Sequence, residues 1–187
     1  ITDRAFNLML TTCRSVEEVK QLAQTINLLG VDPVSLQVSS QNHFFFMDAT
    51  GAGIVLEPQG ASFKVFDNPY GVLTNAPEFD YHTKNLSNYI NLSPIAKETE
   101  VKPYGLGSGM LGIPGDFTPA SRFIRAWYFV SNTAKDLKSQ AALQQAFRIL
   151  GQFDIPDGAV RDTHNNHDDI TLYTAVMDAA QKTYHLK

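Results

Sequence analysis

Residues 70–81 read Tyr70-Gly71-Val72-Leu73-Thr74-Asn75-Ala76-Pro77-Glu78-Phe79-Asp80-Tyr81 and mark a change from strands to a helix. The run before them, 62–67, is typical of a short strand that ends at a turn containing Asn and Pro. Residues 77–89 predict a helix that starts directly after Asn75. Asn75 therefore stands at a strand-to-helix junction, where a side chain can point into a cleft.

Short runs rich in aromatic and β-branched residues precede this junction. They are closed by Gly, Pro, Asn and Asp, which predicts an antiparallel meander. The predicted strands cover residues 36–39, 43–47, 53–57 and 62–67. The unbroken Phe44-Phe45-Phe46 indicates a strand that is covered on both faces, as in a layered fold.

Helices are predicted on both sides of the meander. Ser15-Val16-Glu17-Glu18 has the form of a capping box, and apolar residues then follow at helical spacing until Gly30. Thr118 and Pro119 suit the N-cap and first position of a second helix. Further expected elements are a helix over 138–150, stopped by Gly151, and strands over 170–176 and 183–186.

This order of elements predicts the α+β class, with helical layers over stacked antiparallel sheets. The chain has 187 residues, 43% of them hydrophobic, which is enough for one domain with a real core. We find no internal repeat or low-complexity linker, so we expect residues 1–187 to form a single domain. A sheet of this kind nevertheless needs more strands than the sequence shows.

The composition excludes several classes of function. A net charge of -4 gives no basic footprint for nucleic acid and no polybasic patch for a membrane. No apolar run approaches the length of a membrane span, and the first residues lack the layout of a signal peptide. The chain has 1 cysteine, so it has no internal disulfide.

Two motifs suggest ligands but have ordinary explanations. Residues 107–112 match the dinucleotide pattern GxGxxG, yet Pro103 before them and Pro114 after them do not provide the required strand and helix. The run 164–169, His-Asn-Asn-His-Asp-Asp, offers metal-ligating groups. Asn and Asp also build turns, so we favour a solvated turn over a metal site.

Cys13 is a weak candidate for a nucleophile. Arg14 and the helix start at Ser15 could lower the pKa of a thiol, but the sequence places no specific base beside it. We interpret Cys13 as a small, buried apolar residue.

Asn75 and Arg122 are the stronger candidates. An Asn amide can donate to a developing oxyanion, and Arg supplies fixed positive charge beside a thiolate or carboxylate. Their ordinary interpretations are a helix-capping turn for Asn75 and a surface residue in a first helical turn for Arg122.

Several segments, taken in order, resemble one family. Residues 70–81 and Ser121-Arg122-Phe123 are similar to the asparagine and arginine motifs of the choloylglycine hydrolase family, the bile salt hydrolases and penicillin V acylases. Further similar segments are residues 15–19, 64–69, 112–116 and 170–174. The similarity covers nearly the whole chain.

The resemblance implies a four-layer αββα fold and a hydrolase of linear carbon–nitrogen amide bonds. In that family an N-terminal cysteine attacks the amide, and its own α-amine handles the proton. The matching positions imply that Asn75 helps to bind the oxyanion and that Arg122 sits against the nucleophile. The nucleophile is not among the residues that match, because the chain begins with Ile1 and Cys13 is internal.

We therefore expect residues 1–187 to be the middle and later part of a longer hydrolase domain, inactive when isolated. The implied substrates are conjugated bile salts, penicillin V or related acyl amides. The resemblance implies a small-molecule substrate as partner, no cofactor, no metal, no nucleic acid and no membrane, with a homo-oligomer as a candidate assembly. It leaves the bacterial cytoplasm and the periplasm both open as locations.

Two alternatives stay open from the sequence. The first is a non-catalytic homologue that has lost the nucleophile and binds or scaffolds instead. The second, more remote, is a metal-dependent hydrolase built on His164 and His167.

Overall fold

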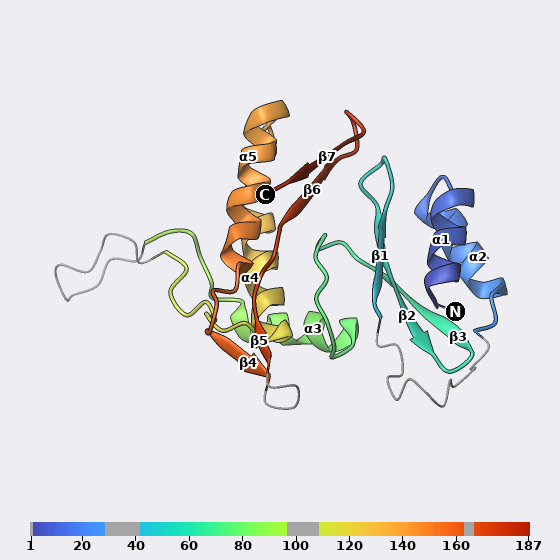
Figure 1. The fold of residues 1–187 in the computed structure, drawn as a ribbon, viewed down its shortest axis with the longest axis horizontal. Helices are drawn as coiled ribbons and strands as arrows, with labels where there is room; N and C mark the ends of the chain where they lie inside the picture. Colours follow the sequence, from blue (N-terminus) through green and yellow to red (C-terminus); the bar gives the residue numbers. More distant parts are fainter. Residues whose placement is uncertain (1, 29–41, 97–108, 163–166) are drawn as a thin grey trace. The chain divides into compact units, whose positions relative to one another are not determined.

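The computed structural model describes residues 2–28, 42–96, 109–162 and 167–187 (Figure 1). The chain divides into two compact units, Ile1–Asn91 and Leu92–Lys187. The expectation that residues 1–187 form one domain stays a prediction.

The first unit packs helices against a three-stranded antiparallel sheet (Figure 1). Its sheet has the order β1-β2-β3, and a 3-10 helix, η1, follows α3 directly. The elements are α1 (Thr2–Thr12), α2 (Val16–Thr25), β1 (Phe44–Met47), β2 (Gly53–Gln59), β3 (Ser62–Asp67), α3 (Phe79–Asn85) and η1 (Leu86–Tyr89). The strands predicted over 43–47, 53–57 and 62–67 are confirmed, and the one over 36–39 lies outside the described residues.

The N-terminus of α2 forms as the sequence predicts. The amide of Glu18 donates to Ser15 Oγ at 3.2 Å, and the Glu18 carboxylate accepts from the amide of Arg14 at 2.7 Å. The helix ends at Thr25, earlier than expected, and Gly30 lies outside the described residues.

Helix α1 was not predicted. Ala5 and Met9 lie one turn apart on it, and both are buried. Phe6 also packs against the core, with its ring 5.2 Å from that of Phe44. The apolar residues of this helix follow one another too closely to give a clean helical stripe.

Both faces of the central strand, β2, are covered, whereas in β1, for which the sequence predicts this, Phe44 and Phe46 are buried and Phe45 is half-buried. In β2 the four consecutive residues from Ile54 to Glu57 are all buried. Ile54 and Leu56 share a cluster with residues of β1, α1 and α2. Because alternate side chains of a strand point to opposite faces, Val55 and Glu57 face the other side. Glu57 meets the first residue of α3 there.

The second unit is built on two long helices. Helix α4 contacts α5, and the hairpin β6–β7 contacts α5 through β6 (Figure 1). The elements are α4 (Pro119–Asn132), α5 (Ser139–Leu150), the 3-10 helix η2 (Gly151–Phe153), β4 (Val160–Asp162), β5 (His167–Asp169), β6 (Ala175–Asp178) and β7 (Thr183–Leu186). The predicted N-cap is confirmed, since Thr118 Oγ1 accepts from the Ser121 amide at 3.4 Å.

Two expectations for this unit are corrected. The strand predicted over 170–176 begins only at Ala175, although Thr174 and Lys187 exchange backbone hydrogen bonds of 2.8 and 2.9 Å. Residues 167–169, interpreted as part of a turn, form the strand β5. The ion pair between Arg161 of β4 and Asp168 of β5, at 2.7 Å, helps to hold these polar residues in a ladder.

None of the helices among the described residues is long and apolar enough to cross a membrane.

Candidate active site

Asn75 lies in the first unit, in the connection between β3 and α3. Its side chain is exposed, while Val72 before it and Phe79 after it are buried. The peptide bond between Ala76 and Pro77 is cis. An exposed amide thus stands on a connection whose two ends are fixed in the core.

Asn68 holds the first part of this connection. Its side chain is buried and donates from Nδ2 to the carbonyl of Val72 at 2.9 Å. Its Oδ1 accepts from the amides of Tyr70 and Gly71, both at 3.1 Å. Gly71 has a φ of 67°, a conformation that glycine adopts without strain.

Glu57 holds the other end. This buried carboxylate of β2 accepts from the amide of Phe79 at 2.6 Å, so that it meets the N-terminus of α3. The imidazole Nδ1 of His43 lies 2.9 Å from the same oxygen. A negative charge at a helix N-terminus is favourable, because the first amides have no partner within the helix.

His82 of α3 contacts Asn75 directly. Its Nε2 lies 2.9 Å from the carbonyl oxygen of Asn75 and 3.3 Å from Thr74 Oγ1. Burial lowers the pKa of His82, the carbonyl of Asn75 opposes that effect, and the charge of His43 lowers the pKa further. Burial is thus the main cause that favours the neutral imidazole of His82 in the folded protein.

Arg122 lies in the second unit, in the first turn of α4. It is half-buried, and its Nε donates to the carbonyl of Phe117 at 3.0 Å. Burial, and then repulsion by Arg125, lower the pKa of the Arg122 guanidinium. Arginine side chains nevertheless stay charged in proteins.

The loop before α4 is braced by Asp116 and Arg125. The Asp116 carboxylate accepts from the Thr118 hydroxyl at 2.6 Å and from the Ser121 hydroxyl at 2.7 Å. These hydrogen bonds lower its pKa from 3.8 to about 2. Buried Arg125 donates from Nη1 to the carbonyls of Pro114 and Asp116, at 2.9 and 2.6 Å. The backbone that presents Arg122 is thus fixed by charged groups.

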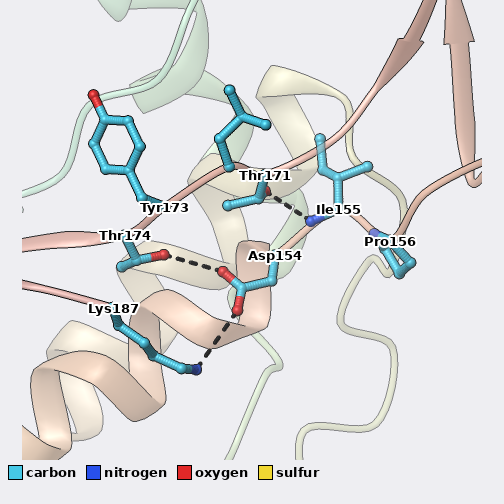
Figure 2. Close-up of a pocket in the computed structure, with 8 residues that line it drawn as sticks. Asp154, Ile155, Pro156, Thr171, Tyr173, Thr174 and Lys187 are labelled. Atoms are coloured by element: carbon cyan, nitrogen blue, oxygen red, sulfur yellow. Dashed lines mark hydrogen bonds and ion pairs between the residues drawn. The ribbon is translucent and has the colours of Figure 1, made fainter.

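The second unit also has an open hollow that holds neither candidate residue (Figure 2). Asp154 lies in it, where it accepts from Thr174 Oγ1 at 3.2 Å and lies 3.8 Å from Lys187 Nζ. Thr171 Oγ1 accepts from the amide of Ile155 at 2.9 Å. The polar groups of this hollow thus hold the segment after η2 against residues next to β6 and β7. We interpret these contacts as structural.

The other sequence candidates lie wholly or partly within the described residues. Cys13 is half-buried and packs beside the core cluster of the first unit. Residues 109–112 form turns, and no helix opens there, while 107 and 108 lie outside the described residues. His164 lies outside them as well. Across the described ranges, His, Cys, Asp and Glu form no group of three that could hold a metal.

Sequence reasoning missed Glu57 and His82. Glu57 is a carboxylate that directly follows three apolar residues within a strand. Because a carboxylate is seldom buried without a partner, such a position indicates that Glu57 binds a polar group in the interior. His82 comes three residues after Phe79 on a short helix, so both lie on its buried face. The hydrogen bonds of Glu57 and His82 to the backbone of residues 75–79 form only in the tertiary structure, so no sequence pattern predicts them.

Comparison with protein families gives a match along nearly the whole chain. Residues 3–187 match the model of the linear amide C–N hydrolases, choloylglycine hydrolase family. A bile salt hydrolase/transferase of Clostridium perfringens is 36% identical over 184 residues, which cover 95% of this chain and 55% of that protein. A conjugated bile acid hydrolase of Lactobacillus acidophilus is 36% identical over 178 residues, which cover 91% of this chain and 55% of that protein. The chain thus spans about half the length of these curated relatives.

Solved structures of two hydrolases share the fold. A mutant of the conjugated bile acid hydrolase from Clostridium perfringens has a TM-score of 0.78 and 32% identity, covering 98% of this chain and 58% of that one. Penicillin V acylase from Agrobacterium tumefaciens has a TM-score of 0.67 and 18% identity, covering 92% and 48%. The second likeness concerns the fold alone. Together with the helices and antiparallel sheets, these likenesses confirm the α+β class and the predicted hydrolase fold.

Proposed function

The chain belongs to the choloylglycine hydrolase family of linear amide C–N hydrolases, and we propose from that membership that the protein containing it cleaves an acyl amide. The nucleophile in this proposal is an N-terminal cysteine outside residues 1–187. Asn75 and Arg122 are the residues of this chain that assist it.

The proposed reaction has two steps. The α-amine of the cysteine takes the proton of the thiol, and the resulting thiolate attacks the amide carbonyl. The α-amine then passes that proton to the leaving nitrogen as the C–N bond breaks, and an acyl-enzyme forms. Water then attacks the thioester, and the carboxylic acid leaves the restored thiol. Negative charge develops on the carbonyl oxygen in both steps, so a fixed amide donor accelerates both.

The observation that carries the proposal is the environment of Asn75. Its side chain is exposed, while buried Asn68, Glu57 and His82 hold the backbone around it. A donor fixed before the reaction stabilises an oxyanion without reorganisation. A helix cap would serve the first turn of α3, but there Glu57 already accepts from the amide of Phe79.

Arg122 is proposed to stabilise the cysteine in its thiolate form. A guanidinium beside a thiol lowers the pKa of that thiol, because the thiolate is the form that gains from the charge. The carboxylate of Asp116 accepts hydrogen bonds from the hydroxyl groups of Thr118 and Ser121 and so fixes the loop before α4. Arg122 is thus held by its backbone contacts at the start of α4.

For the substrate we propose an amide with a bulky apolar acyl group, with conjugated bile salts as the first class to test. The named bile salt relatives are 31% to 36% identical to this chain, whereas the penicillin V acylase shares 18%. Penicillin V is accordingly the second class to test.

The test compares two asparagine variants of the full polypeptide as its source encodes it. Asn75→Ala is expected to lower kcat for a glycine- or taurine-conjugated bile salt by about 100-fold to 1000-fold, as loss of one oxyanion donor does. Asn88→Ala removes an exposed asparagine of the same unit, whose Nδ2 donates to Asn85, and is expected to leave kcat unchanged. Equal rates in both variants, or no amide hydrolysis by the parent protein, would overturn the proposal.

A further inference from the structure

The connection that carries Asn75 is held by buried polar side chains. His82 has 0% of its surface exposed and Glu57 has 6%. Burying a polar group costs free energy unless it finds a partner. Both find their partners in the backbone of residues 75–79.

The hydrogen bond of His82 has a defined direction. A carbonyl oxygen only accepts, so the Nε2 of His82 must carry the proton and donate to the Asn75 carbonyl at 2.9 Å. The neutral imidazole that burial favours can have this tautomer. The same nitrogen also lies 3.3 Å from Thr74 Oγ1.

This bond acts on the peptide unit that follows the Cα of Asn75. Fixing that carbonyl restricts the ψ angle of Asn75. It thereby restricts the direction in which the exposed side chain of Asn75 projects from the backbone. Glu57 fixes the amide of Phe79 a few residues later and thereby the start of the helix that bears His82. His82 and Glu57 thus fix the backbone at Asn75 and at Phe79, the two ends of this short segment.

We propose that His82 is a positioning residue, which orients Asn75 for catalysis through the backbone carbonyl of Asn75. This inference rests on the proposed function of Asn75. Small displacements of a catalytic group have large kinetic effects, since a misplacement of about 1 Å can cost about 100-fold in rate.

The experiment compares glutamine and asparagine at position 82 in the full polypeptide. The amide nitrogen of Gln can reach the place of the imidazole Nε2, whereas that of Asn, shorter by one methylene, cannot. His82→Gln is expected to keep kcat within about 3-fold of the parent protein. His82→Asn and His82→Leu are expected to lower kcat by about 10-fold or more, with KM changed by less than about 3-fold.

A double-mutant cycle separates positioning from general damage. In an Asn75→Ala background there is no donor left to orient, so His82→Asn is expected to have no further effect on kcat. If kcat falls by the same factor in both backgrounds, or if Gln is as poor as Asn, His82 has only a structural role. The Gln and Asn pair gives this answer even when the Leu variant does not fold.

The two proposals fail in different ways. If Asn75→Ala itself leaves kcat unchanged, the proposed function of Asn75 fails. If Asn75→Ala lowers kcat while all variants at position 82 match the parent protein, only the positioning role fails.

Discussion

The carboxylate of Asp116 fixes the backbone at the N-terminus of α4. Its carboxylate accepts from the amide and the hydroxyl of Thr118 and from the hydroxyl of Ser121. Asp116 is itself exposed, so solvent weakens the electrostatic part of these bonds. Their effect is to fix the loop from which Arg122 projects.

The depressed pKa of Asp116 predicts an acid-dependent loss of stability. The folded pKa of about 2 lies below the ordinary 3.8, so this contribution is present above pH 3.8 and is lost as the pH falls toward 2. Asp116→Asn is expected to lower the free energy of unfolding at pH 7 by about 1 kcal/mol and to flatten its dependence on pH below 4. Urea unfolding at pH 7 and pH 3 measures both effects. Asp157→Asn, at an exposed loop position of the same unit, is the control and should change neither.

His82 predicts a second dependence on pH, near neutrality. Its folded pKa is lowered, chiefly by burial, so the unfolded chain binds a proton more readily. The stability that depends on neutral His82 is complete above pH 6.5, the ordinary pKa, and falls as the pH drops below it. His82→Gln keeps a donor but does not titrate. Urea unfolding between pH 7.5 and pH 5.5 is therefore expected to show a smaller loss in the variant, and equal losses would contradict a neutral buried imidazole.

At the scale of single residues, the sequence identifies the candidate catalytic side chains but not the side chains that hold them in place. Asn75 and Arg122 could be selected because their residue types suit an oxyanion and a thiolate, and because their motifs resemble a family. Glu57 and His82 could not, since their function depends on contacts with residues 22 and 7 positions away. Such contacts exist only after the sheet and α3 have packed.

At the scale of the element, the cap of α2 is the clearest case of a local signal. Ser15→Ala removes the oxygen that accepts from the Glu18 amide and is expected to lower the free energy of unfolding by about 1 kcal/mol. Urea unfolding measures the change. Ser131→Ala, at an exposed position in the last turn of α4, is the control and should stay within about 0.5 kcal/mol of the parent protein. Equal effects would mean that the cap contributes nothing.

The predicted elements were right where turn residues and apolar periodicity agree. The meander of β1, β2 and β3 and the helices α4 and α5 follow these rules. The strands β4 and β5 were missed because their residues, Val-Arg-Asp and His-Asp-Asp, are mostly polar. The run 170–174 is rich in strand formers, but within the described part of the chain its backbone bonds to other segments are made at its two threonines. Thr171 donates to the carbonyl of Ile155, and Thr174 exchanges two bonds with Lys187.

At the scale of the whole molecule, the hairpin β6–β7 has an exposed apolar face. Met177 and Tyr184 stand opposite each other in the ladder and are 76% and 60% exposed. Leu186, on the same face, is 64% exposed. Contiguous exposed apolar surface of this kind promotes association.

The isolated 187-residue chain is therefore expected to self-associate. Met177→Glu should reduce this association, because it places a charge in the centre of the apolar face. Gln181→Glu adds the same charge in the exposed turn of the hairpin and should have less effect. Light scattering of the purified chains measures the difference, and equal association of the two variants would exclude this face as its cause.

The central claim is that Asn75 and Arg122 assist a cysteine nucleophile that lies outside these residues. Intact mass and N-terminal sequencing of the protein, as its source produces it, combined with an amide hydrolysis assay, test this claim most directly. We predict a longer polypeptide that begins with cysteine and hydrolyses a conjugated bile salt or penicillin V, and an isolated 187-residue chain that does neither. A mature protein that begins at Ile1, or hydrolysis by the isolated chain, would contradict the account.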